Sequence, residues 1–136
     1  MREKPIILHA AIRGDRITGI YRTEEAALAS LPDGTEPLPL AGAPEPDGCV
    51  YAATGCLHVA PDMVFRLSPA LGTTPALALA GLLEPPMPGT RAEATSLRAY
   101  VPGRDYTDAL PPELIGSAGV QQLLAAHACH FPANPL

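Results

Sequence analysis

Cysteine and histidine side chains, which can bind metals or serve as nucleophile and base, gather in two stretches of this sequence. Cys56 and His58 are separated by one residue, and His127, Cys129 and His130 lie near the C-terminus. Residues two apart on a strand point to the same face, so Cys56 and His58 could bind one ion. Residues three apart on a helix are neighbours, which holds for His127 and His130. A metal site of Cys56, His58, His127 and His130 is therefore one hypothesis.

A second hypothesis uses the same region as a thiol enzyme, with Cys56, His58 and Asp62 as the catalytic set. Cys129 is a poor nucleophile, because it falls at a predicted helix C-terminus, where the dipole opposes thiolate formation. Neither Cys/His pair has the spacing of a known zinc motif. The simplest interpretation is that the sulfur and imidazole groups fill space between packed elements and do not converge. On that interpretation we expect no cofactor and no catalytic residue.

The composition indicates a globular chain with few charges. Of 136 residues, 47% are hydrophobic and only 17% are charged, against roughly 25% in typical soluble domains. Sparse surface charge favours association, so we expect another protein or self-assembly as the partner. The net charge is −5, and residues 23–62 contain no Lys or Arg. Nucleic-acid binding needs a sustained basic face, and we do not expect it here.

No stretch of the sequence predicts export or membrane insertion. The N-terminal apolar run is broken by His9 and is too short for a membrane span or a signal peptide. Three cysteines, an odd number without an export signal, indicate reduced thiols. We therefore expect a protein that is cytoplasmic, or incorporated in a particle assembled there, with no membrane partner.

The elements that must position these side chains begin with a β-hairpin followed by a helix, a ββα unit over residues 5–31. Gly14 and Asp15 fit a two-residue turn with glycine where φ must be positive. The register predicted about this turn pairs Ile12 with Ile17, Ala10 with Gly19 and Leu8 with Tyr21. One apolar face then carries Ile6, Leu8, Ala10, Ile12, Ile17 and Tyr21.

The helix of this unit is predicted from its first turn. Thr23 can cap it through its hydroxyl, and Glu24 and Glu25 follow where carboxylates favour the helix dipole. Leu28 and Leu31 are expected to pack on the hairpin. This order of strand, turn, Gly-Ile-Tyr and capped helix resembles the hybrid-binding module attached to some ribonucleases H. Such modules carry aromatic and basic residues near the helix start, where this chain has Thr23, Glu24 and Glu25, so we do not infer nucleic-acid binding from the resemblance.

The remaining segments complete the prediction of a single α+β domain over residues 1–136. Residues 32–48 contain five prolines and predict a loop. Residues 49–101 predict further short antiparallel strands, with turns at Gly55 and at Pro61-Asp62; these strands are 49–53, 56–60, 63–67 and 94–101.

A C-terminal helical segment is predicted over residues 111–131. Ser117 can cap its main helix, and one apolar stripe follows at helical spacing: Val120, Leu123, Leu124, His127 and Phe131.

These features favour a non-enzymatic protein-interaction module. Such a module could be a small accessory protein, an inhibitor, or a structural subunit of a larger assembly, including one encoded by a phage. The expected contact surfaces are residues 33–48 and 84–91, with Met87 as an exposed apolar group. One alternative is a small metal- or thiol-dependent enzyme that uses the Cys56/His58 and His127/Cys129/His130 groups. A second alternative is an acidic mimic of nucleic acid, which requires the acids of residues 24–47 to lie on one face.

Overall fold

The computed structural model describes residues 6–14, 16–32, 34–43, 48–84 and 88–130, except for the side chains of residues 126–130. The described residues form a mixed α+β structure in which a sheet dominates. Its elements, in chain order, are β1 (Ile6–Arg13), β2 (Arg16–Tyr21), α1 (Glu24–Ser30), β3 (Thr35–Ala41), β4 (Val50–Ala60), β5 (Met63–Arg66), β6 (Ala70–Gly72), α2 (Pro75–Leu83), β7 (Arg91–Tyr100) and α3 (Ala118–His130).

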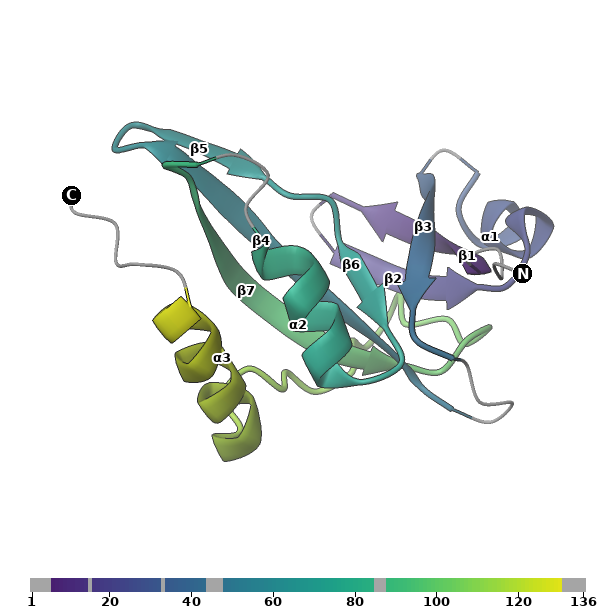
Figure 1. Ribbon diagram of the computed structural model, residues 1–136. Helices are drawn as coiled ribbons and strands as arrows, with labels where there is room; N and C mark the ends of the chain where they lie inside the picture. The colour runs from purple at the N-terminus through teal and green to yellow at the C-terminus, as the bar shows by residue number, and fades with distance from the viewer. Residues whose placement is uncertain (1–5, 15, 33, 44–47, 85–87, 131–136) are drawn as a thin grey trace, which may run out of the picture.

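All seven strands belong to one mixed sheet that curls into a half-barrel (Figure 1). The order β2-β1-β3-β6-β4-β5 runs across it, and β7 pairs along the other edge of β4. β6 and β5 lie along one edge of β4, where β6 pairs with Tyr51, Ala52 and Ala53, and β5 pairs farther along the strand. The β4, β5 and β7 strands therefore form a three-stranded extension that projects beyond the rest of the sheet (Figure 1).

The two faces of the sheet are buried in different ways. Its inner face supplies the main core, formed by Leu8, Ala10, Ile17, Ile20, Leu38, Leu40, Val50, Ala52, Leu71 and Tyr100. Its outer face is covered by helices. α2 and α3 bury Ala53 and Leu97, while α1 covers Ala11 and Tyr21. Apolar burial on both faces of the sheet is the main source of its stability.

The segment that follows β7 covers the open edge of β2. The backbone N–H of Gly103 donates to Ile20 O at 2.8 Å, and the N–H of Tyr106 donates to Thr18 O at 2.7 Å. The Tyr100 hydroxyl donates to Ile17 O at 3.0 Å, and its ring meets the Tyr106 ring edge-on at 5.2 Å. These contacts tie the last strand of the chain to the first hairpin.

The predicted hairpin register is correct only next to the turn. Ile12 pairs with Ile17 as expected, but Ala10 pairs with Ile20 and Ala11 with Gly19, because Thr18 is an extra residue in β2. A one-residue slip moves every later side chain to the other face. Ile20 therefore enters the main core. Tyr21 does not share that face as predicted, and packs under α1 instead.

The prediction of a loop over residues 32–48 is wrong for Thr35–Ala41, which is strand β3, paired antiparallel with β1, while residues 33 and 44–47 lie outside the described residues. Pro37 and Pro39 are two residues apart, so both direct their missing N–H to the same side of the strand. Among the described strands, β3 pairs with β6 only at Leu40 and Ala41, so no described strand pairs with the proline positions on that side. The two hairpin strands are thus part of a larger sheet on which α1 packs. The predicted ββα unit is not confirmed as a separate arrangement.

Two predicted strands are one, because β4 continues from Val50 through Gly55 to Ala60. Gly55 is therefore not a turn. The predicted turn at Pro61-Asp62 does separate β4 from β5. The predicted strand 94–101 begins earlier, at Arg91.

The helix caps match the local sequence chemistry. Thr23 Oγ1 accepts from Ala26 N at 3.2 Å, and Ser117 Oγ accepts from Val120 N at 3.3 Å. In α1, Ala27 is fully buried while Leu28 is exposed, so the expected packing of Leu28 is wrong. In α3, Val120 is buried and Leu123 is exposed; His127 and Phe131 of the predicted stripe lie outside the described side chains.

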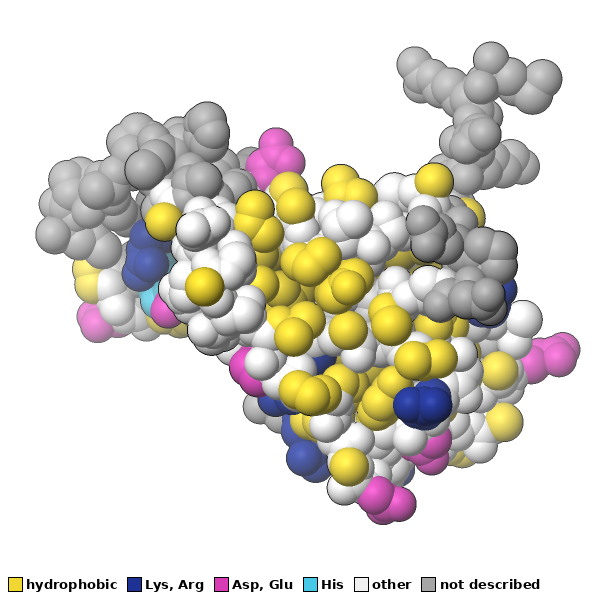
Figure 2. Space-filling view, turned by 90° about the horizontal axis from the view of Figure 1, so that it is seen from below, with side chains coloured by type: hydrophobic (Ala, Val, Ile, Leu, Met, Phe, Trp, Pro, Cys, Tyr) yellow, Lys and Arg dark blue, Asp and Glu magenta, His cyan; other side chains and the backbone are white. Residues whose placement is uncertain are grey.

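Figure 2 shows that hydrophobic side chains gather in one broad area on the underside of the molecule, with charged side chains mainly at its margins. Among the described helices, none combines the length and apolar character needed to cross a membrane.

Candidate metal centre

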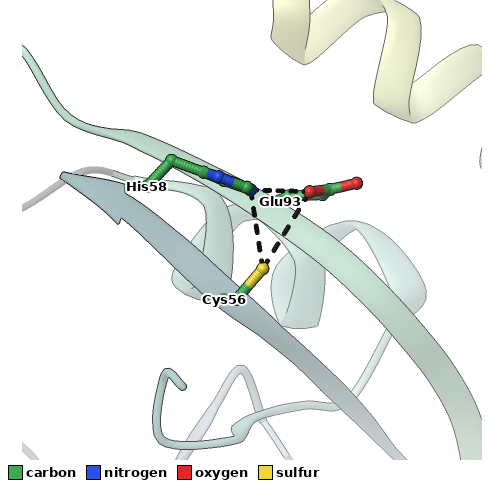
Figure 3. A group of neighbouring side chains, drawn as sticks. All are labelled: Cys56, His58 and Glu93. Atoms are coloured by element: carbon green, nitrogen blue, oxygen red, sulfur yellow. Dashed lines mark hydrogen bonds and ion pairs between the residues drawn. The ribbon is translucent and has the colours of Figure 1, made fainter. Parts of the chain in front are cut away.

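Three side chains from two neighbouring strands meet on one face of the three-stranded extension. Cys56 and His58 are two residues apart on β4, so they share a face. Glu93 of β7 is the direct cross-strand partner of Cys56, and therefore shares that face as well. Figure 3 shows the three side chains pointing toward one another.

A β-bulge determines that Glu93 belongs to this group. Thr54 pairs with Ser96, and the next residue, Gly55, pairs with Ala94, so the register shifts by one residue at this point. Without that shift Cys56 would face Ala94, and Glu93 would lie on the opposite face of the sheet.

Gly55 makes the close approach of the two strands feasible. A Cβ atom at this position would lie 2.1 Å from the carbonyl oxygen of Glu93. Real Cβ atoms do not approach a backbone oxygen so closely, so only glycine fits here without moving one of the strands.

The donor atoms of the three side chains lie within 4.8 Å of one another. His58 Nε2 is 2.7 Å from Glu93 Oε2 and 3.6 Å from Cys56 Sγ, and Cys56 Sγ is 3.9 Å from Glu93 Oε2. In a tetrahedral zinc site the sulfur–nitrogen separation is about 3.5 Å and the nitrogen–oxygen separation about 3.3 Å, as the usual bond lengths require. A small movement of the Glu93 carboxylate away from His58 Nε2 would bring the three donor atoms close to these separations.

The arrangement is not that of a nucleophilic catalytic triad. In such a triad the nucleophile contacts one imidazole nitrogen and the acid holds the other, so that a proton can pass through the ring. Here the Cys56 sulfur and the Glu93 carboxylate both face the same nitrogen, His58 Nε2. A sulfur, a nitrogen and an oxygen donor that lie this close together can bind a single metal ion.

The electrostatics keep the Cys56 sulfur protonated when no ion is bound. Burial raises the pKa of the Cys56 thiol, and the nearby Glu93 carboxylate raises it further, while Arg91 opposes both effects. A metal ion reverses this balance, because its charge stabilises the thiolate and the carboxylate together.

The group is accessible from solvent. The His58 side chain is 23% exposed and the Glu93 side chain 49% exposed. An ion bound here would keep at least one coordination position open to water or a ligand, as catalytic zinc sites do.

Of the predicted site residues, the structure brings Cys56 and His58 together. Cys56 and His58 do meet, so the interpretation that these sulfur and imidazole groups never converge is wrong for this pair. The acid beside them is Glu93 and not Asp62, which lies in the turn after β4. His127, Cys129 and His130 lie in α3, and their side chains are outside the described residues. Cys49, which precedes β4, is exposed and lies outside this group.

Glu93 is not predicted from the sequence, because its place in the group depends on the pairing of β4 with β7. The only local signal is a carboxylate in the alternating sequence of β7. Comparison of the chain with protein-family models, curated protein sequences and solved structures finds no match.

Proposed function

We propose that this protein binds a divalent transition metal, zinc by preference, through Cys56, His58 and Glu93, and uses the open coordination position for a ligand or substrate. The supporting observation is the convergence of a sulfur, a nitrogen and an oxygen donor within 4.8 Å on one exposed sheet face. Thiolate and imidazole ligands favour zinc over magnesium or calcium, which prefer oxygen alone. Of the functions expected from the sequence, this proposal is nearest to the small metal-dependent enzyme that uses Cys56 and His58.

Zinc titration of protein stripped with EDTA tests this proposal. Native mass spectrometry is expected to find one zinc ion per chain, and competition with a chromophoric chelator gives the affinity. Cys56→Ser is expected to weaken binding by about 100-fold or more, since loss of outer-shell partners alone weakens binding about 10–100-fold. Cys49→Ser is the matched control, because Cys49 is also a free thiol outside the site. Absence of stoichiometric zinc, or equal losses in the two variants, contradicts the proposal.

A second candidate function, protein interaction, is favoured by the edge strand β5. Its four residues are exposed, and Met63, Val64 and Phe65 remain about half exposed, at 48%, 51% and 51%. β5 pairs only with β4 among the described strands, so its outer edge offers free backbone hydrogen-bonding groups. Natural edge strands usually carry charges, prolines or bulges that prevent pairing, and β5 has only Arg66.

We propose a second copy of this chain as the occupant of the β5 edge. Antiparallel pairing of two β5 strands about a two-fold axis would place Val64 of each copy beside Phe65 of the other. Sedimentation of the wild type and of Val64→Lys over a range of concentrations tests this. A dimer that the substitution abolishes supports the candidate, and a monomer at every concentration contradicts it.

The predicted contact surfaces and the acidic mimic have no comparable observation in their favour. In the predicted 84–91 surface, residues 85–87, which include Met87, lie outside the described residues. Residues 35–41 of the expected 33–48 contact surface are strand β3, already paired with β1. Of the acids in residues 24–47, Glu24 and Glu25 begin α1 and Glu36 lies on β3, while the other three fall outside the described residues.

A further inference from the structure

Two arginines lie beside the three metal ligands on the same face of the extension. Strand pairing places Arg66 of β5 directly opposite Cys56, on the side away from Glu93. It places Arg91 of β7 directly opposite His58. Direct cross-strand partners share a face, so the ligand group lies between two arginines set on a diagonal.

Both arginines have donors free for a ligand. Arg66 is exposed, and its Nη1 donates to Gly14 O at 3.4 Å, which uses one of the five N–H groups of the guanidinium. Arg91 is exposed, and its side chain makes no hydrogen bond or ion pair with any other residue that the structure describes.

The charges around a bound ion favour an anionic ligand. The Cys56 thiolate and the Glu93 carboxylate would neutralise a divalent ion, which leaves the two arginine charges without a counterpart in the group. An anion at the open position would therefore meet a metal ion and two guanidinium groups, which bind oxyanions through paired hydrogen bonds.

The number of cationic groups around the site fits a phosphate monoester better than a carboxylate. Strands are about 4.8 Å apart and residues rise about 3.3 Å, so the Cα atoms of Arg66 and Arg91 are roughly 12 Å apart across β4. Arginine side chains that extend inward from both sides can reach a ligand above β4. A carboxylate has two oxygens and a phosphodiester has two non-bridging oxygens, whereas a phosphate monoester has three, one for each of the three cationic groups.

We propose that the Cys56–His58–Glu93 site binds a phosphate monoester, with one oxygen on the metal and the others held by Arg66 and Arg91. This inference rests on the proposed metal site and adds the chemical class of its ligand.

Cobalt(II) in place of zinc makes the test visible, because its absorption spectrum reports both occupancy and coordination. The cobalt-loaded full chain is titrated with inorganic phosphate, and separately with dimethyl phosphate and acetate, at constant ionic strength. Phosphate is expected to change the visible bands with saturation. Arg66→Gln and Arg91→Gln, each compared with the wild type at saturating cobalt, are expected to weaken phosphate binding about tenfold, as loss of a charged hydrogen-bond partner requires. Arg104→Gln, an exposed arginine on the segment after β7, is the matched control and should bind phosphate normally.

Each other outcome contradicts a defined part of the inference. Cobalt binding without a phosphate response, or equal weakening by Arg104→Gln, overturns the phosphate site and leaves the metal site standing. A response to dimethyl phosphate or acetate as strong as that to phosphate overturns the monoester assignment. Failure to bind cobalt overturns the metal site, and the phosphate inference with it. Circular dichroism of each variant verifies that the exposed substitutions leave the fold intact.

Discussion

His58 Nε2 lies 2.7 Å from Glu93 Oε2, although 35 residues separate the two in the sequence. The pair joins the central strand of the extension to its neighbour β7, and Cys56 completes the group at 3.6 Å from the same nitrogen. Their convergence depends on a bulge in β7 and on a glycine in β4, so the fold and the site can be tested together.

Metal affinity should rise with pH. Burial and Glu93 raise the pKa of Cys56, so the thiol is protonated at neutral pH in the metal-free protein. Zinc binding must release that proton, and affinity is therefore expected to rise about tenfold per pH unit between pH 7 and 8.5. Chelator competition at several pH values measures the slope. The Cys56→Ala variant has no thiol proton to release, so its zinc affinity should depend less on pH. An equal dependence of zinc affinity on pH in this variant and in the wild type would contradict the assignment of Cys56 as a ligand.

Gly55→Ala should disturb both stability and metal binding. The added methyl would lie 2.1 Å from Glu93 O, so β4 and β7 must separate locally. We expect a loss of about 1–3 kcal/mol in the free energy of unfolding, typical of overpacking, together with weaker zinc binding. Gly119→Ala is the control, since nothing lies within 4 Å of the position its methyl would take. Urea unfolding that shows the same change in both variants would disagree with the strand pairing.

Because of the bulge at Thr18, Ile20 should contribute strongly to the free energy of unfolding. The register shift at Thr18 directs the Ile20 side chain into the main core, where it is fully buried. The Ile7 side chain on β1 is 42% exposed. Ile20→Ala is expected to lower the free energy of unfolding by about 2–5 kcal/mol, and Ile7→Ala by much less. Comparable small effects from both substitutions would support the bulge-free register, in which Ile20 lies away from the core.

Tyr100 should make the protein sensitive to alkali. Burial raises the pKa of Tyr100 to about 12, and its hydroxyl donates to Ile17 O. The unfolded chain loses this proton near pH 10, so stability should fall by about 1.4 kcal/mol per pH unit between pH 10 and 12. Tyrosine absorbance at alkaline pH is expected to show a titration step near pH 12, and Tyr100→Phe should remove that step. A titration curve without this late step, or one that Tyr100→Phe leaves unchanged, would contradict the buried hydrogen bond.

Local chemistry was enough to predict several elements. The glycine at the first turn, Gly14, has the expected positive φ of 67°. The caps at Thr23 and Ser117 depend only on neighbouring residues, and both are confirmed. Alternating apolar residues also identified most of the strands, because one face of each is buried.

The remaining features depend on non-local pairing. Nothing in the sequence near Thr18 or Thr95 indicates that an extra residue is inserted there, yet each bulge changes which side chains share a face. The alternate prolines of β3 predict a loop, although proline is also compatible with a strand edge that has no pairing partner. For the site, the sequence placed Cys56 and His58 on one strand face, but Glu93 could be assigned only after β4 was paired with β7.

The absorption spectrum of the cobalt(II)-loaded protein is the most direct test of a metal centre at Cys56, His58 and Glu93. A thiolate ligand adds a near-ultraviolet sulfur-to-cobalt charge-transfer band to the visible bands of a four-coordinate ion. We predict that the wild type shows both at one equivalent of cobalt and that Cys56→Ser loses the charge-transfer band, while Cys49→Ser retains it. A spectrum with no charge-transfer band in the wild type, or one that Cys56→Ser leaves unchanged, would contradict the account.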